Sequence, residues 1–120
     1  MRVLITGSRD WTDEVTIRGA LLPLQEDELC HGDARGADKI AGRIAEELGW
    51  KVTPFPVDTS IDGPWPAAGH HRNRRMFDAF KPDLVLAFPL PQSRGTVGMV
   101  DYATSKGCIV VTHVTTEEAK

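Results

Sequence analysis

Five short apolar segments separated by helical patterns constrain the fold of this 120-residue chain more than any other feature. The segments are residues 2–6, 28–31, 51–56, 83–88 and 108–113. Helical spacing or helix-capping residues lie between them, over residues 12–24, 35–48, 67–80 and 95–106. Parallel strands need such crossovers, and crossovers of this kind are right-handed. The sequence therefore predicts a Rossmann-like α/β three-layer sandwich with a mostly parallel sheet of about five strands.

Capping residues and prolines set the expected limits of the helices. Thr12 and Asp13 can cap the first helix, and Pro23 should end it. Gly49 stands where a C-terminal glycine cap belongs, and Pro82 should end the third helix. The sequence thus marks both ends of the first helix and the C-terminal ends of the second and third helices.

Two stretches stand out for their burial or irregularity. Residues 83–88 are continuously apolar, so we expect this strand near the centre of the sheet. Residues 59–66 contain one glycine and two prolines, which predicts a long ordered loop or a mobile lid without regular structure. We expect one domain over residues 1–114 and a polar tail over residues 115–120.

Composition narrows the function classes. The net charge of −3 argues against general duplex nucleic-acid binding but leaves room for a local basic pocket. Cys30 and Cys108 each lie in an apolar run, so we expect small core residues in a reducing compartment. The N-terminal run has no cleavage site, and no apolar run approaches the ~20 residues of a membrane span. A cytoplasmic protein without a membrane partner is expected.

Three strand ends are followed by loops that combine glycine, a small or hydroxylic residue and arginine. These loops contain Gly7, Ser8 and Arg9; Gly32, Arg35 and Gly36; and Arg94, Gly95 and Thr96. Glycine lets backbone amides approach a ligand, a helix N-terminus favours an anion, and arginine binds phosphate or carboxylate with two donors. One such loop is also typical of a tight turn with an exposed arginine. Three on one edge of a parallel sheet favour an anion-binding site.

The start of the third helix adds basic residues. Arg72, Arg74 and Arg75 form either an exposed basic face or, in the case of Arg72, a wall of the pocket. Residues one turn apart share a helix face, so Arg72 points with Met76 and away from Arg74 and Arg75. Asn73 is expected to cap the helix or bind a ligand.

Other candidates have simpler structural explanations. Asp38 lies in the first turn of a helix, where the helix dipole alone favours a carboxylate, so we assign it a supporting role in the site. His70 and His71 lack the Cys or carboxylate neighbours of a metal site, and no metal or cofactor is expected. Trp65 is the best placed of the tryptophans to stack on a base. Gly7 to Thr12 lacks the later glycines of a dinucleotide-binding loop, and no phosphate-binding NTPase loop is present.

Taken together, these motifs closely resemble the YspA-related family of the SLOG superfamily. They are Gly7-Ser8-Arg9, His31-Gly32-x-Ala34-Arg35-Gly36-Ala37-Asp38, Arg72-Asn73-x-x-Met76, Lys81-Pro82-Asp83 and Ser93-Arg94-Gly95-Thr96. The superfamily shares a Rossmann-like fold with lonely-guy phosphoribohydrolases, DprA/Smf proteins and molybdenum-cofactor carriers. The resemblance implies binding of a nucleotide or ribose derivative.

The resemblance also raises the question of catalysis. Lonely-guy hydrolases carry a catalytic glutamate where this chain has Met99, which can neither stabilise an oxocarbenium ion nor move a proton. Asp33 or Asp38 is the candidate substitute. The first hypothesis is therefore a nucleotide-binding sensor, carrier or sponge, with a homodimer through the third and fourth helices as a further expectation. The alternatives are an N-glycosidic phosphoribohydrolase and a single-stranded nucleic-acid binder.

Overall fold

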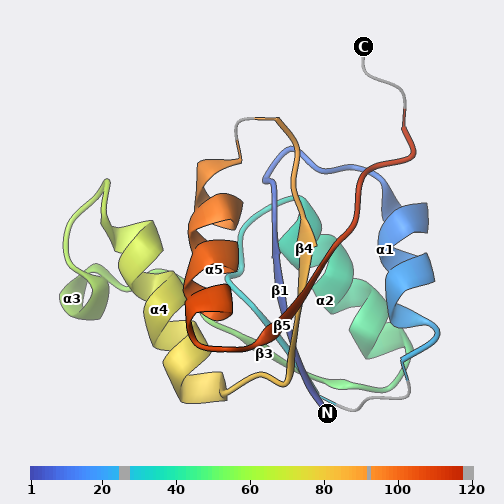
Figure 1. The fold of residues 1–120 in the computed structure, drawn as a ribbon, viewed down its shortest axis with the longest axis horizontal. Helices are drawn as coiled ribbons and strands as arrows, with labels where there is room; N and C mark the ends of the chain where they lie inside the picture. Colours follow the sequence, from blue (N-terminus) through green and yellow to red (C-terminus); the bar gives the residue numbers. More distant parts are fainter. Residues whose placement is uncertain (25–27, 92, 118–120) are drawn as a thin grey trace.

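The structure is a computed structural model that describes residues 1–24, 28–91 and 93–117, and it contains one parallel five-stranded sheet (Figure 1). The strands are β1 (Arg2–Gly7), β2 (Glu28–His31), β3 (Lys51–Pro54), β4 (Leu84–Phe88) and β5 (Ile109–Thr112). Their order is β3-β2-β1-β4-β5, which confirms the predicted Rossmann-like α/β fold. β1 lies in the middle, and β4, which we expected near the centre, is flanked by β1 and β5.

Helices cover both faces of the sheet. They are α1 (Glu14–Leu21), α2 (Ala37–Glu47), α3 (Thr59–Asp62), α4 (Ala68–Phe80) and α5 (Arg94–Ser105). Figure 1 shows α1 and α2 on one side of the strands and α4 and α5 on the other. Because the order of strands reverses between β1 and β4, the carboxyl ends of these two strands mark the usual ligand crevice of such a sheet.

Alternation along the central strand produces two cores. Val3 and Ile5 pack with α1 and α2, whereas Leu4 packs with α4 and α5. All three side chains are fully buried, and each contributes about 1.5–3 kcal/mol through removal of apolar surface from water. Cys30 lies in the second core, as expected.

The segment from residue 59 to 66 differs from the prediction of an irregular loop, because its first residues form the one-turn helix α3. Asp58 caps this turn by accepting hydrogen bonds from the backbone N–H and the hydroxyl of Ser60 (2.9 and 2.6 Å). Asp62 accepts from the N–H of Asp58 (2.9 Å), and Gly63 ends the turn with a φ of 82°. Glycine and proline limit the helix to one turn here, and the hydrogen bonds accepted by Asp58 and Asp62 stabilise that turn.

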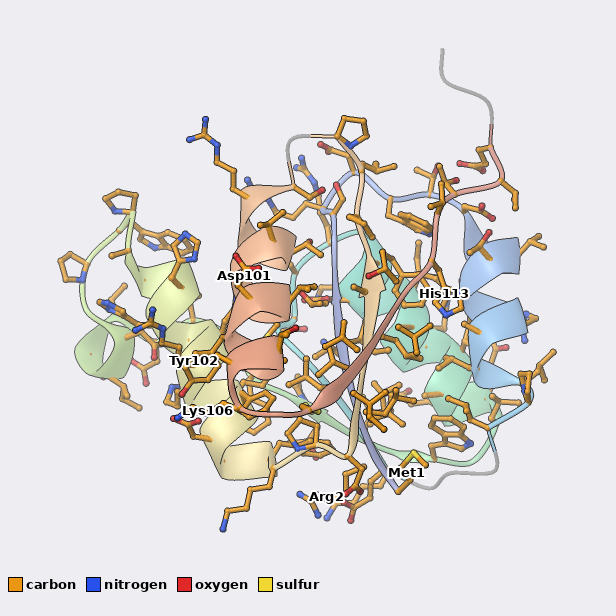
Figure 2. The ribbon with its side chains drawn as sticks, viewed as in Figure 1. Met1, Arg2, Asp101, Tyr102, Lys106 and His113 are labelled. Carbon is orange, nitrogen blue, oxygen red and sulfur yellow. The ribbon has the colours of Figure 1, made fainter. Side chains whose placement is uncertain are left out.

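Helices α4 and α5 pack closely against each other. Tyr102 on α5 donates a hydrogen bond to Asp78 on α4 (2.8 Å) and meets Phe77 edge to face (5.4 Å between ring centroids). Figure 2 shows Tyr102 and Lys106 on the same side of α5. Most apolar side chains of these helices are therefore buried within the domain, but Val97 on α5 is 56% exposed. A homodimer through these helices stays a prediction.

Asp13 caps α1, as predicted, and it also holds residues of the expected tail. Its carboxylate accepts from Thr16 N–H (3.0 Å), from the Thr115 hydroxyl (2.9 Å) and from the N–H and hydroxyl of Thr116 (both 2.8 Å). Burial alone would raise the pKa of Asp13, but the hydrogen bonds from Thr16 and Thr116 hold it well below its usual range. No helix within the described ranges is long and apolar enough to cross a membrane.

Replacement of Asp13 by alanine should destabilise the fold by about 2–3 kcal/mol at pH 7, because one helix cap and several hydrogen bonds to a charged group are lost. Since the folded pKa is lowered, this contribution is present above about pH 4 and is lost as the pH falls. Urea unfolding at pH 7 and at about pH 2.5 measures it. Asp58→Ala, which removes an exposed cap, is the control and should cost less. An equal cost of both substitutions at pH 7 would contradict the assigned role.

Candidate functional site

The loop after β1 packs directly on the first turn of α2 and on the end of β4. The carbonyl of Ser8 accepts from Ala37 N–H (3.1 Å), and Ser8 N–H donates to the carbonyl of Phe88 (3.0 Å). A Cβ on Gly36 would lie 2.5 Å from the Ser8 carbonyl oxygen, and one on Gly7 would lie 2.4 Å from Ala37 Cβ. Packing therefore requires glycine at both positions. The loops after β1, β2 and β4 lie together at one edge of the sheet.

Two arginines of the predicted site lie side by side at this edge. Arg35 donates from Nε to the carbonyl of Arg9 (3.3 Å) and pairs through Nη2 with Asp10 (3.1 Å). The Arg35 side chain is 73% exposed, so this ion pair contributes little to stability. Its guanidinium is therefore available to an incoming anion.

Asp38 holds the loop after β2 from behind. Its Oδ2 accepts from the N–H groups of Gly32 (3.0 Å) and Ala34 (3.3 Å), and the residue is only 6% exposed. Burial raises the pKa of Asp38 to about 6, against the opposing effect of these hydrogen bonds and of Arg72. Asp33, the other carboxylate of the loop, has a positive φ of 59° and pairs with Lys39 (3.1 Å). Both carboxylates have structural partners.

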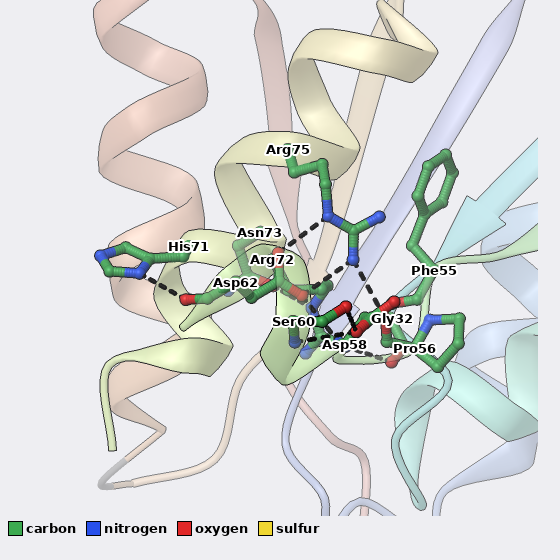
Figure 3. A network of polar contacts seen from close by, with 10 residues as sticks. All are labelled: Gly32, Phe55, Pro56, Asp58, Ser60, Asp62, His71, Arg72, Asn73 and Arg75. Atoms are coloured by element: carbon green, nitrogen blue, oxygen red, sulfur yellow. Dashed lines mark hydrogen bonds and ion pairs between the residues drawn. The ribbon is translucent and has the colours of Figure 1, made fainter. Parts of the chain in front are cut away.

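The predicted direction of Arg72 toward the sheet edge is seen in the structure (Figure 3). Its Nη1 donates to the carbonyls of Gly32 and of Phe55 (3.1 Å for Phe55), and its Nε donates to Asn73 Oδ1 (2.9 Å). A Cβ on Gly32 would lie 2.6 Å from the Arg72 guanidinium carbon. Arg72 thus ties α4 to the ends of β2 and β3 and explains why residue 32 is a glycine.

The prediction that Arg75 belongs to an exposed basic face of α4 is wrong. Arg75 binds Asp62 with two donors (Nε to Oδ1 2.8 Å, Nη2 to Oδ2 2.9 Å) and donates to the carbonyl of Pro56 (3.1 Å). The Asp62 side chain is 1% exposed, and the hydrogen bonds from Arg75 lower its pKa to about 2. His71 contacts the Asp62 carbonyl (2.7 Å). Sequence reasoning missed Asp62, because it is 13 residues from its partner.

The third predicted loop leads into α5. Arg94 and Gly95 are exposed in the first turn of this helix, and Thr96 is buried (3% exposed). Apart from the chain neighbours and the backbone of α5 itself, no atom of the described residues lies within 4 Å of the position where a Cβ of Gly95 would be. Gln92, which precedes these residues in the chain, lies outside the described residues.

The helix α5 also shows where the residue at the hydrolase glutamate position lies. Met99 is 1% exposed and packs in the second core with Leu4 and Met76. Asp101 is exposed on the same helix (Figure 2). In the part of the chain that the structure describes, no group of three or more His, Cys, Asp or Glu side chains is arranged to hold a metal.

Neither Trp65 nor the cavity lined by Cys108 forms part of these loops. Trp65 is 63% exposed on the segment before α4, whereas Trp11 and Trp50 are buried in the first core. A cavity of about 510 Å³ opens between the C-termini of α4 and α5, at the opposite edge of the sheet, and Cys108 lines it. Burial raises the pKa of Cys108, so this thiol is protonated at neutral pH.

Asp38→Asn tests the role of the buried carboxylate. Asparagine keeps an oxygen for the Gly32 and Ala34 amides but carries no charge. Because the folded pKa of Asp38 is raised, the stability of the wild type falls as the pH rises from about 4 through about 6. The variant should therefore gain about 2–3 kcal/mol over the wild type between pH 4 and pH 7.5 in urea unfolding.

Asp62→Asn is the matched control for Asp38→Asn. Its folded pKa is lowered, so this substitution should destabilise the protein at neutral pH and have less effect as the pH falls. A parallel pH dependence of the two variants would show that Asp38 is not a buried carboxylate that costs stability when charged.

Comparison with known proteins agrees with this arrangement. The family model of the YspA, cpYpsA-related SLOG family matches residues 1–60, which include β1, β2 and the loops that follow them. The Gene 61 protein of Mycobacterium phage D29 is 40% identical over 122 aligned residues, which cover 92% of this chain and 94% of the relative. The chain therefore belongs to the YspA, cpYpsA-related SLOG family.

Proposed function

We propose that the chain binds the phosphate and ribose of a nucleotide or nucleotide-derived small molecule at the carboxyl edge of the sheet. The site would comprise Gly7, Ser8, Arg9, Gly32, Arg35, Gly36, Arg72, Asn73, Arg94, Gly95 and Thr96, with Asp38 in a supporting role. Membership of the SLOG family supports this class of ligand, and the fold brings the three loops to one edge. A cytoplasmic sensor, carrier or sponge would use such a site without chemistry.

The open surroundings of Gly95 are the observation that carries the proposal. Gly7, Gly32 and Gly36 are glycines because protein atoms occupy the space of a side chain. Gly95 has no such neighbour and lies in the first turn of a 12-residue helix that follows β4. The first N–H groups of a helix have no acceptor within it, and they attract an anion. A glycine here lets a phosphate reach them.

The exposed arginines complete the argument. Arg9 and Arg35 come from the loops after β1 and β2, on the side of the switch point opposite to Arg94. A phosphate at the N-terminus of α5 and a ribose toward α2 would then use two of the helices that follow strands at this edge. Asp38 would act on the ligand only through the Gly32 loop that it holds.

Gly95→Val should weaken binding of a nucleoside monophosphate about ten-fold or more, because its side chain blocks the approach of the phosphate to the helix N-terminus. Folding should be little affected, since nothing surrounds this position. Calorimetry and thermal shift with nucleoside monophosphates and ribose 5-phosphate measure both quantities. Gly19→Val is the matched control, because Gly19 is also a helical glycine in open surroundings.

Arg35→Ala provides a second variant at the same site. Loss of a hydrogen bond to a charged group should weaken the phosphate ligand by about 1.5–3 kcal/mol. Arg18→Ala removes another exposed arginine with one carboxylate partner, Glu47, and should leave affinity unchanged. Unchanged affinity in folded Gly95→Val and Arg35→Ala would refute the site.

The chain should release no free base from nucleoside monophosphates, because Met99 is buried in the core and both loop carboxylates have structural partners. A missing general acid or base removes about 10²- to 10⁴-fold in rate. A product assay with saturating monophosphate tests this. Saturable base release that Asp38→Asn or Asp33→Asn abolishes would instead establish the phosphoribohydrolase alternative, which the raised pKa of Asp38 would then explain.

A further inference from the structure

A second, smaller cavity lies beside α2 and the edge strand β3, away from the switch point of the sheet. It has a volume of about 250 Å³, which is the space of roughly eight water molecules. Its lining consists of His31, Asp33, Lys39, Gly42, Arg43, Glu46, Val52 and Pro54. Only Asp33 among these was a candidate in the nucleotide site.

His31 forms the inner wall of this cavity and is 5% exposed. It is the last residue of β2, on the face of the strand that packs on α2, and it lies opposite Pro54 of β3. A Cβ at Gly42 would lie 2.7 Å from His31 Nε2. The Nε2 edge of the ring therefore faces α2 at Gly42, and both residues line the cavity.

The hydrogen bonding of the ring fixes where its proton is. Nδ1 of His31 accepts from the N–H of Asp33 (2.9 Å), so the proton of the neutral ring is on Nε2. Burial lowers the pKa of His31, with further lowering by Lys39 and Arg72 and an opposing effect of Asp33. The ring is therefore a neutral donor at physiological pH.

The Nε2–H group has no acceptor among the described residues. The interactions of His31 involve only Nδ1 and nearby charges, and no fully buried side-chain nitrogen or oxygen in the described ranges lacks a partner. Nε2 is therefore reached from the cavity. The acceptor of this N–H therefore comes from the cavity, either as water or as a polar group of a bound molecule that displaces it.

We propose that this cavity binds the carboxylate of a small molecule, with the Nε2–H of His31 donating to it and Lys39 contributing a positive charge from the cavity lining. The Lys39 side chain is 60% exposed and pairs with Asp33 (3.1 Å). Lys39 and Arg43 are balanced by Asp33 and Glu46, so the lining is neutral overall and favours a monoanion over a dianionic phosphate. Val52 and Pro54 offer a short apolar wall to an aliphatic group.

This site is independent of the proposed nucleotide site, and each can fail without the other. The two are adjacent only through the loop after β2, because His31 holds the Asp33 amide while Asp38 holds the Gly32 and Ala34 amides. The test below uses no nucleotide and reads the imidazole directly.

The experiment is a titration of the full chain, labelled with ¹⁵N-histidine, with sodium acetate, sodium phosphate and sodium chloride at equal ionic strength. Long-range ¹H–¹⁵N spectra report both ring nitrogens of His31. We expect the Nε2–H tautomer in the free protein and a saturable shift of Nε2 with acetate but not with chloride. An equal response to chloride would overturn the proposal, and tighter binding of phosphate would overturn the assignment to carboxylates.

Two variants separate this site from non-specific effects. Gly42→Ala places a methyl group at the Nε2 atom and should weaken acetate binding about ten-fold or more. Gly19→Ala, the same substitution in open surroundings on α1, should leave it unchanged. If Gly42→Ala does not fold, His31→Phe keeps the ring and removes the donor, with the Gly42 amide as the reporter. Undiminished acetate binding in either folded variant would overturn the proposal.

Discussion

The contact between the loop after β1 and the first turn of α2 is the constraint on which the rest of the carboxyl edge depends. The carbonyl of Ser8 accepts from the Ala37 N–H, and the Ser8 N–H donates to the Phe88 carbonyl at the end of β4. Ser8 therefore links the loop after β1 to α2 and to β4. Such close approach is possible only with no side chain at Gly7 and Gly36. The backbone at the switch point is therefore set by packing within the chain, and a ligand there would meet a preformed surface.

Buried aspartates hold the segments around this surface, and their surroundings decide the sign of each pKa shift. Asp13 and Asp62 receive hydroxyl or guanidinium donors, which stabilise the charged form, so their pKa values fall. Asp38 receives two amides at one oxygen, and burial outweighs them, so its pKa rises. The loop after β2 thus rests on a carboxylate that costs stability when charged, whereas the α3 segment and residues 115–116 rest on carboxylates that contribute it.

Patterns within one element were predictable from the sequence, and contacts between distant elements were not. Apolar patterns in the sequence predicted the strands and the longer helices, and capping residues such as Asp13 and Gly49 marked helix ends. Helical direction correctly separated Arg72 from Arg74, which lies over the Tyr102 ring. The partner of Arg75 was missed because a bidentate pair across two helices leaves no local pattern. The sequence also did not show that protein atoms occupy the space where side chains of Gly7, Gly32 and Gly36 would lie, because those atoms belong to distant residues.

The use of arginines inside the fold bears on the size of the ligand. Binding to a nucleic-acid strand needs several free cations along a groove, together with exposed stacking surfaces. Arg72 instead donates to backbone carbonyls and Arg75 pairs with Asp62, so neither guanidinium is free to bind a strand. The exposed guanidiniums that remain in the candidate site, Arg9, Arg35 and Arg94, surround the ends of β1, β2 and β4. Three cations around one short edge, beside the acidic Asp10, suit a compact anion better than a polymer.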